Sequence, residues 1–229
     1  MLRTASSIVF SALVAVAAIW PMPAAAVLVT GGFSGQIFQG SDFGSDPGGY
    51  FGAGFDLTDL PITGTFRYDT KEVPPPSSTG ANFATYGDPT FATDFLDFSV
   101  SINGRTYTFG TFPANPGIQT IEVIDNTDQL QFDYQRFGIG VSESLALRFI
   151  SDIDFLTGIG VPTHFDFTAS GVGLTPGGTF SFDLPNGDFA SASFTIDRGF
   201  ARATLPEPAM LGMVALGLLG IAAVRRRSA

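Results

Sequence analysis

The chain has 229 residues, a formal net charge of −10 and no cysteine, and this length suits one sizeable domain with terminal segments. Its 24 phenylalanines and 28 glycines, with only 14% charged residues, favour short strands and tight turns over long helices. Residues 27–204 carry 20 acidic and 7 basic side chains, a net charge of −13, which argues against a nucleic-acid partner, and the lack of cysteine excludes disulfides, thiolate catalysis and cysteine-ligated metals.

The first 26 residues have the layout of a secretory signal peptide. Arg3 precedes an apolar run of twelve residues, 8–19, which is too short to span a bilayer and has the length of a signal-peptide core. Ala24 and Ala26 occupy the −3 and −1 positions of a cleavage site after Ala26. We therefore expect residues 1–26 to form a signal helix that is removed on export, with an uncleaved membrane anchor as the alternative.

Residues 27–204 show the two-residue alternation of β-strands and no convincing helical periodicity. Outside two hairpins, we expect strands at 27–38, 64–68, 120–124, 130–134, 145–150 and 164–168. Three prolines make residues 74–78 a loop, because proline cannot donate to a strand ladder. Eight to ten strands, roughly, in a domain of this length indicate a β-sandwich or jelly roll.

The two hairpins can be paired residue by residue. A two-residue turn at Asn103 and Gly104 places Val100 opposite Tyr107 and keeps the apolar side chains of both strands on one face. For residues 178–196 we expect a three-residue loop at 186–188, because it sets large rings against small alanines. The expected pairs are Leu184 with Ala190, Phe182 with Ala192, and Phe180 with Phe194.

No catalytic motif is evident in this domain. Its only histidine, His164, shares a strand face with Asp166, but a Ser-His-Asp hydrolase also needs a positioned serine. The G-x-S-x-G sequence of a nucleophile elbow is absent. We therefore interpret His164 as a solvent-facing residue and expect no enzymatic activity.

Pairs of carboxylates keep a glycoside hydrolase open as an alternative function. Asp152 and Asp154 share one face of an extended segment, and Asp94 and Asp97 lie close in sequence. On an acidic surface, however, such pairs are most often only solvated.

Calcium is the one metal that the sequence offers ligands for, although we expect no cofactor. Residues 125–133 supply hard oxygen ligands, namely Asp125, Asn126, Asp128 and Asp133. Asp42 and Asp46 lie in a second, glycine-rich segment. Neither segment has the EF-hand spacing, and loop-forming Asp and Asn residues explain both without metal.

Exposed aromatic rings would allow a carbohydrate-binding module, our alternative to a purely structural domain. The candidates for stacking on sugar are Tyr50, Tyr86 and Trp20, but Trp20 lies in the expected signal peptide. The mature domain would then contain no tryptophan, which weakens this alternative.

The chain ends with a sequence motif, an apolar run and a basic cluster. These are Pro206, Glu207 and Pro208, then residues 210–224, then Arg225, Arg226 and Arg227. As a helix the apolar run would be about 22 Å long, short for a hydrocarbon core of about 30 Å. We expect a short transmembrane helix that anchors poorly, with the arginines cytoplasmic and the domain periplasmic.

These features at the extreme C-terminus resemble the PEP-CTERM protein-sorting domain, over residues 205–229. The resemblance implies recognition of residues 206–208 by an exosortase, a membrane-embedded cysteine transpeptidase-like enzyme of Gram-negative bacteria that make extracellular polysaccharide. The protein would pass transiently through the inner membrane and then be released or attached at the cell surface, with exopolysaccharide as a further partner. An ordinary C-terminal membrane anchor is the alternative.

Overall fold

The computed structural model describes residues 26–44, 46–87, 94–111, 117–138, 140–170 and 175–204. The described residues form strands joined by turns and one short 3₁₀ turn, Asp125–Thr127. The strands are β1 (Leu28–Phe43), β2 (Pro61–Asp69), β3 (Pro76–Thr79), β4 (Phe83–Tyr86), β5 (Leu96–Ile102), β6 (Arg105–Thr108), β7 (Ile118–Ile124), β8 (Gln129–Gly138), β9 (Val141–Ile150), β10 (Phe165–Thr168), β11 (Gly177–Asp183) and β12 (Phe189–Thr204). The prediction of an all-β domain is confirmed.

None of the described segments is a helix long and apolar enough to cross a membrane. The expected transmembrane run at 210–224 lies outside the described residues, as does the expected signal helix apart from Ala26.

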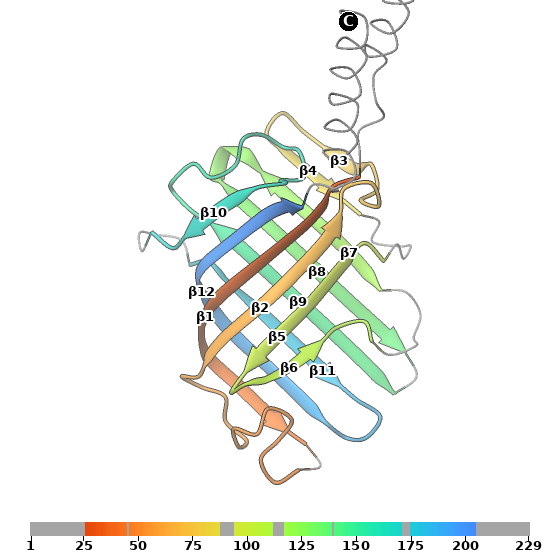
Figure 1. The fold of residues 1–229 in the computed structure, drawn as a ribbon, viewed down its shortest axis with the longest axis vertical. Coiled ribbons are helices and arrows are strands. Elements are labelled where there is room, and N and C mark those ends of the chain that lie inside the picture. The colour runs from red at the N-terminus through yellow and green to blue at the C-terminus, as the bar shows by residue number, and fades with distance from the viewer. Residues whose placement is uncertain are drawn as a thin grey trace, which may run out of the picture.

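All twelve described strands belong to one sheet, in the order β3-β4-β7-β8-β9-β11-β12-β1-β2-β5-β6, with β10 attached to β12. The sheet curls so that β1, β2 and β5 cross in front of β8, β9 and β11 (Figure 1). Phe66 of β2 lies 4.8 Å from Phe132 of β8, and Tyr107 of β6 stacks on Phe182 of β11 at 3.9 Å, measured between ring centroids. The two-layer packing that we expected of a β-sandwich is therefore made within a single sheet.

The two longest strands, β1 and β12, carry the sheet from one layer to the other. They pair antiparallel from Leu28–Thr204 to Phe43–Phe189, with register shifts beside Phe38 in β1 and Asp197 in β12. Thr204 Oγ1 donates a hydrogen bond to the Leu28 carbonyl at 2.7 Å. The first and last strand residues of the domain therefore lie side by side (Figure 1).

Phenylalanine and glycine fit together in the core, which explains their abundance. A side chain at Gly31 would come within 2.0 Å of the buried Phe66 ring, and one at Gly64 within 2.3 Å of Phe33. The glycines in the strands thus make room for rings from the neighbouring strand. Burying these rings is the main stabilising contribution, because the chain has no disulfide.

The first hairpin is confirmed and the second has a different register. Val100 pairs with Tyr107 around Asn103 and Gly104 as expected. In the second hairpin the loop is 185–187 instead of 186–188, because Gly187 adopts a positive φ of 86° and its N–H donates to the Leu184 carbonyl. The observed pairs are Phe182 with Ala190, Phe180 with Ala192, and Gly178 with Phe194. Large residues still face small ones, but each partner lies two residues away along β12 from where we placed it.

The proline-rich segment 74–78 was wrongly expected to be a loop throughout. Pro76 begins β3, which pairs only with β4 and lies at the end of the sheet. An edge strand tolerates proline because one side of its backbone needs no partner. A register shift follows Pro76 directly.

Candidate functional site

Two adjoining hollows mark the outer face of the sheet. One, of about 400 Å³, lies over β8, β9, β11, β12 and β1, and the other, of about 380 Å³, shares Thr179 and Ser193 with it. We call their joint lining the outer-face groove. It comprises Gln131, Arg148, residues 177–181, residues 191–194 and residues 38–41, with contributions from Ser144, Ala146 and Thr175.

The floor of the outer-face groove is shallow and rich in hydroxyl groups. Gly177 pairs with Arg148 of β9 on one side and with Thr195 of β12 on the other, and it adds no side chain to the floor. A row of serines crosses four strands, namely Ser144, Ser181, Ser191 and Ser41. The oxygens lie 2.8 Å apart in the Ser144–Ser181 pair and 3.3 Å apart in the Ser41–Ser191 pair.

Phe38 lies at the margin of this groove, at a β-bulge in β1. Ile37 pairs with Phe194 and Gln39 pairs with Ser193, so Phe38 is the extra residue of β1. The bulge breaks the alternation at Gln39, which then lies on the same side of the strand as Phe38. Phe38 and Gln39 both face outward, and 59% of Phe38 is exposed.

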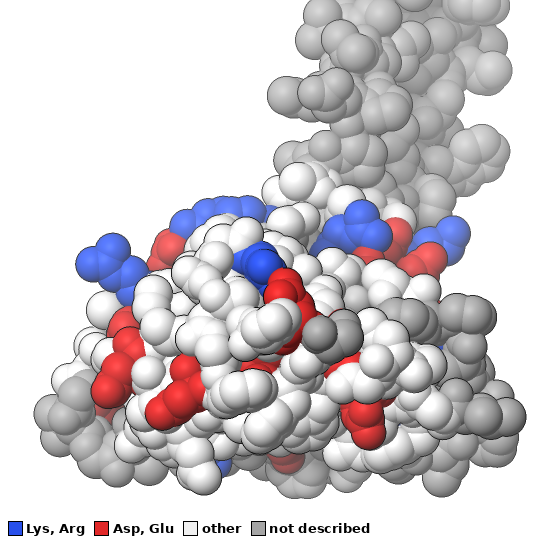
Figure 2. Space-filling model, turned by 90° about the horizontal axis from the view of Figure 1, so that it is seen from below, with Lys and Arg blue, Asp and Glu red and all other residues white. Residues whose placement is uncertain are grey.

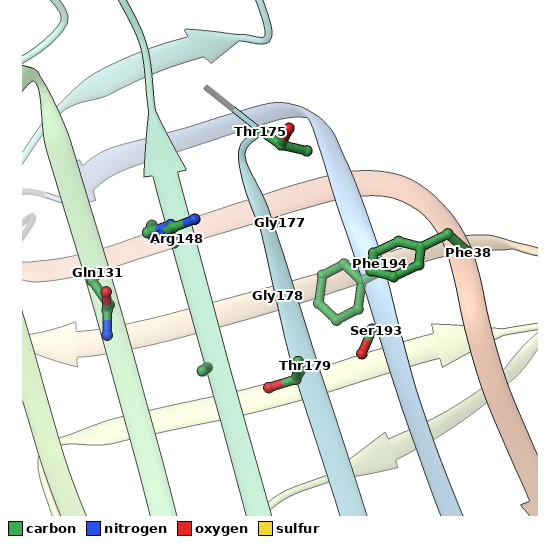
Figure 3. Close-up of a pocket in the computed structure, with 10 residues that line it drawn as sticks. Phe38, Gln131, Arg148, Thr175, Gly177, Gly178, Thr179, Ser193 and Phe194 are labelled. Carbon is green, nitrogen blue, oxygen red and sulfur yellow. The ribbon is translucent and has the colours of Figure 1, made fainter. Parts of the chain in front are cut away.

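Arg148 is an exposed cation of the groove, opposite Gln131 of β8 (Figure 3). No acidic side chain of the described residues lies within 4 Å of its guanidinium. In contrast, Arg67 and Arg202 form ion pairs of 2.5 Å. Figure 2 shows this general pattern, with basic side chains lying next to acidic ones on the face viewed.

The expected calcium ligands do not converge. Asp125 and Asp128 flank the turn between β7 and β8, whereas Asp133 lies further along β8, where it accepts a hydrogen bond from Gln131 at 2.8 Å. No group of three His, Cys, Asp or Glu residues in the described ranges has a metal-binding arrangement.

Asp42 and Asp46, the second calcium candidates, have structural partners. Asp42 is fully buried and accepts hydrogen bonds from the N–H groups of Tyr50 and Phe51 at 2.7 and 2.8 Å. Asp46 lies 3.7 Å from Arg105. Asp42 thereby holds the loop after β1 against the domain, as loop-forming aspartates do.

The residues considered for hydrolysis also have structural partners. His164 Nε2 lies 3.8 Å from Asp166 Oδ2, and both side chains are exposed, as we expected for His164. Asp166 also pairs with Arg202. Of a second expected pair, Asp97 accepts a hydrogen bond from Arg67 and Asp94 accepts one from Gln119. Asp152 and Asp154 lie in the segment after β9.

The expected sugar-stacking rings differ from Phe38, the exposed ring that lines the outer-face groove. Tyr50 packs edge-on against Phe182 at 4.9 Å, and the Tyr86 hydroxyl donates to the Ile159 carbonyl at 2.9 Å. Both are only partly exposed. Phe38 was missed, and the only signal for it was the break in alternation around Gln36–Gln39, where apolar residues occur on both faces.

The raised pKa values of three carboxyl groups predict an unusual pH dependence of the stability of the folded protein. Burial raises the pKa of Asp42, Asp128 and Asp133, while hydrogen bonds from Thr58 lower the pKa of Asp56. A raised pKa means that the folded protein binds protons where the unfolded chain has released them. We therefore expect the midpoint of thermal unfolding to rise as the pH falls from 7 towards about 4.

Circular dichroism melts at constant ionic strength test this expectation. Asp133→Asn should flatten the dependence, which separates the buried carboxyl from the general repulsion among acidic residues. A steady loss of stability over the same pH range would contradict the expected direction.

The comparisons with known proteins identify the C-terminal segment only. Residues 204–227 match the family model of the PEP-CTERM protein-sorting motif. No curated protein and no solved structure matches the chain. Residues 206–208, 225–227 and Ala24 lie outside the described residues, whereas Ala26 and Thr204 lie next to the paired ends of β1 and β12.

Proposed function

We propose that this chain, which carries a PEP-CTERM sorting motif at residues 204–227, is exported through a signal peptide and processed by an exosortase at the inner membrane. Its β domain then acts without catalysis at the cell surface or outside the cell, in or beside the polysaccharide matrix. The match of the sorting motif is the observation that carries this proposal.

The position of the domain's ends supports the same route. Leu28 and Thr204 are paired neighbours, so the expected signal-peptide cut after Ala26 and the sorting motif adjoin one end of the sheet. Removing both terminal segments therefore leaves every described strand intact. The outer face of the curled sheet stays free to contact other molecules.

Carbohydrate binding is a second candidate, favoured by the outer-face groove. The groove combines an exposed ring, hydroxyl groups and the Arg148 guanidinium, and among the described residues no Asp, Glu or His lines its two hollows. Such a surface can bind a sugar but offers no general acid or base for cleaving one. This composition supports binding over the hydrolase alternative.

The intact mass of protein recovered from the cell surface or medium tests the proposed route. We expect a chain that begins at Val27 and lacks Arg225, Arg226 and Arg227, because both terminal segments are cut off. Any extra mass would identify a group attached at the new C-terminus. Recovery of the 229-residue mass in these fractions would contradict the proposal.

A further inference from the structure

We propose that the outer-face groove binds an acidic saccharide, with a sugar ring against Phe38 and a carboxylate held by Arg148. The inference rests on the proposed extracellular role and specifies the ligand class for its carbohydrate-binding candidate. Sorting and saccharide binding can be tested separately, because sorting depends on residues 204–227 and binding depends on the residues of the groove.

The shape of the groove suits a chain of sugars. Its two hollows, about 400 and 380 Å³, open on the surface and join at Thr179 and Ser193. A buried small-molecule pocket would enclose most of its ligand. An open groove across several strands instead accommodates a polymer that continues beyond the protein.

Phe38 supplies the apolar contact. Phe38 follows Gln36 on the outward-facing side of β1, and the bulge places Gln39 on that side as well. Aromatic rings contribute a large contact area with few rotatable bonds. The C–H face of a sugar ring can cover Phe38 while its hydroxyl groups reach Gln39 and the serine row.

Arg148 supplies the charge selectivity. The domain repels anions overall, with 20 acidic and 7 basic residues, yet this guanidinium has no acidic partner among the described residues. Asp133 pairs with Ala146 at the margin of the groove, and its carboxylate accepts a hydrogen bond from Gln131. The planar fork of arginine matches a carboxylate in geometry and charge.

Titration calorimetry with an oligogalacturonate and its methyl ester tests this assignment, using full-length protein purified in detergent. We expect saturable binding of the acid form and binding of the ester that is weaker by about tenfold or more, since a hydrogen bond to a charged group is lost. Acetate at the same concentration should not displace the oligosaccharide. Equal binding of acid and ester, displacement by acetate, or no binding of the acid form would overturn the proposal.

Matched variants locate the site. Arg148→Gln and Phe38→Ala should each weaken binding by about tenfold. Arg198→Gln and Phe137→Ala should leave it within about twofold, because both residues are exposed and lie outside the groove. Equal losses in all four variants would overturn the location.

Chemical labelling gives a readout that needs no variant. Phenylglyoxal modifies exposed arginines, and bound oligosaccharide should slow the modification of Arg148 while Arg198 reacts unchanged. Unchanged labelling of Arg148 would overturn its role. A protein that is processed correctly but binds no acidic saccharide would refute this inference alone.

Discussion

Replacing Pro206, Glu207 and Pro208 together with alanine should stop maturation of the protein. The apolar run that follows would still hold the chain at the inner membrane, but the processing enzyme would lack its recognition motif. We expect nearly all of the protein to remain full-length in the membrane fraction. Immunoblots of membrane, surface and medium fractions measure this directly.

A control variant separates motif recognition from general effects of losing proline and glutamate. Glu72→Ala combined with Pro75→Ala alters the same residue types at exposed positions of the folded domain, so it should mature normally. If the motif variant also matured and reached the surface normally, the sorting role of residues 206–208 would be wrong.

Phe66→Ala should be among the most destabilising single substitutions in the domain. The Phe66 ring is 1% exposed and lies within 6.4 Å of the rings of Tyr68, Phe132, Phe149 and Phe165, measured between centroids. Its removal leaves a cavity where the two layers meet. We expect a loss of about 3–5 kcal/mol in the free energy of unfolding, measured by urea denaturation.

Phe137→Ala is the matched control for this prediction, because 61% of Phe137 is exposed. It should change the free energy of unfolding by less than about 0.5 kcal/mol. Similar losses in both variants would contradict the packing of β2 against β8, on which the curled sheet depends.

The sequence predicts local features of this fold well. The alternation of apolar and polar residues predicts which side chains face the core, and the Asn103-Gly104 turn predicts a hairpin. Both features are predictable because each depends only on residues that are neighbours in the sequence. The second hairpin was misplaced because both registers set rings against alanines, so this match could not choose between them, whereas the positive φ of Gly187 belongs to the observed loop. Local turn geometry therefore decided the register.

Pairing between distant strands could not be predicted in the same way. Alternation shows which face of a strand is buried, but not which strand lies beside it. The contact between Leu28 and Thr204 spans 176 positions, and the two-layer packing of one sheet depends on it. The outer-face groove has the same origin, since Phe38 and Arg148 line one groove only because β11 and β12 lie between their strands.

The sorting motif was predictable for the opposite reason. It lies in one short stretch, and its recognition depends on consecutive residues and on the apolar run and arginines beside them. The match to residues 204–227 needed no knowledge of the fold.

The central place of β12 has a consequence for the order of events during export. This strand joins β1 on one side to β10 and β11 on the other, so neither layer is complete without it. A polypeptide threaded through a translocation channel from its N-terminus delivers β12 last. On the export route proposed above, the sheet would therefore close only after residue 204 had emerged, which is also the point at which the sorting segment would reach the membrane.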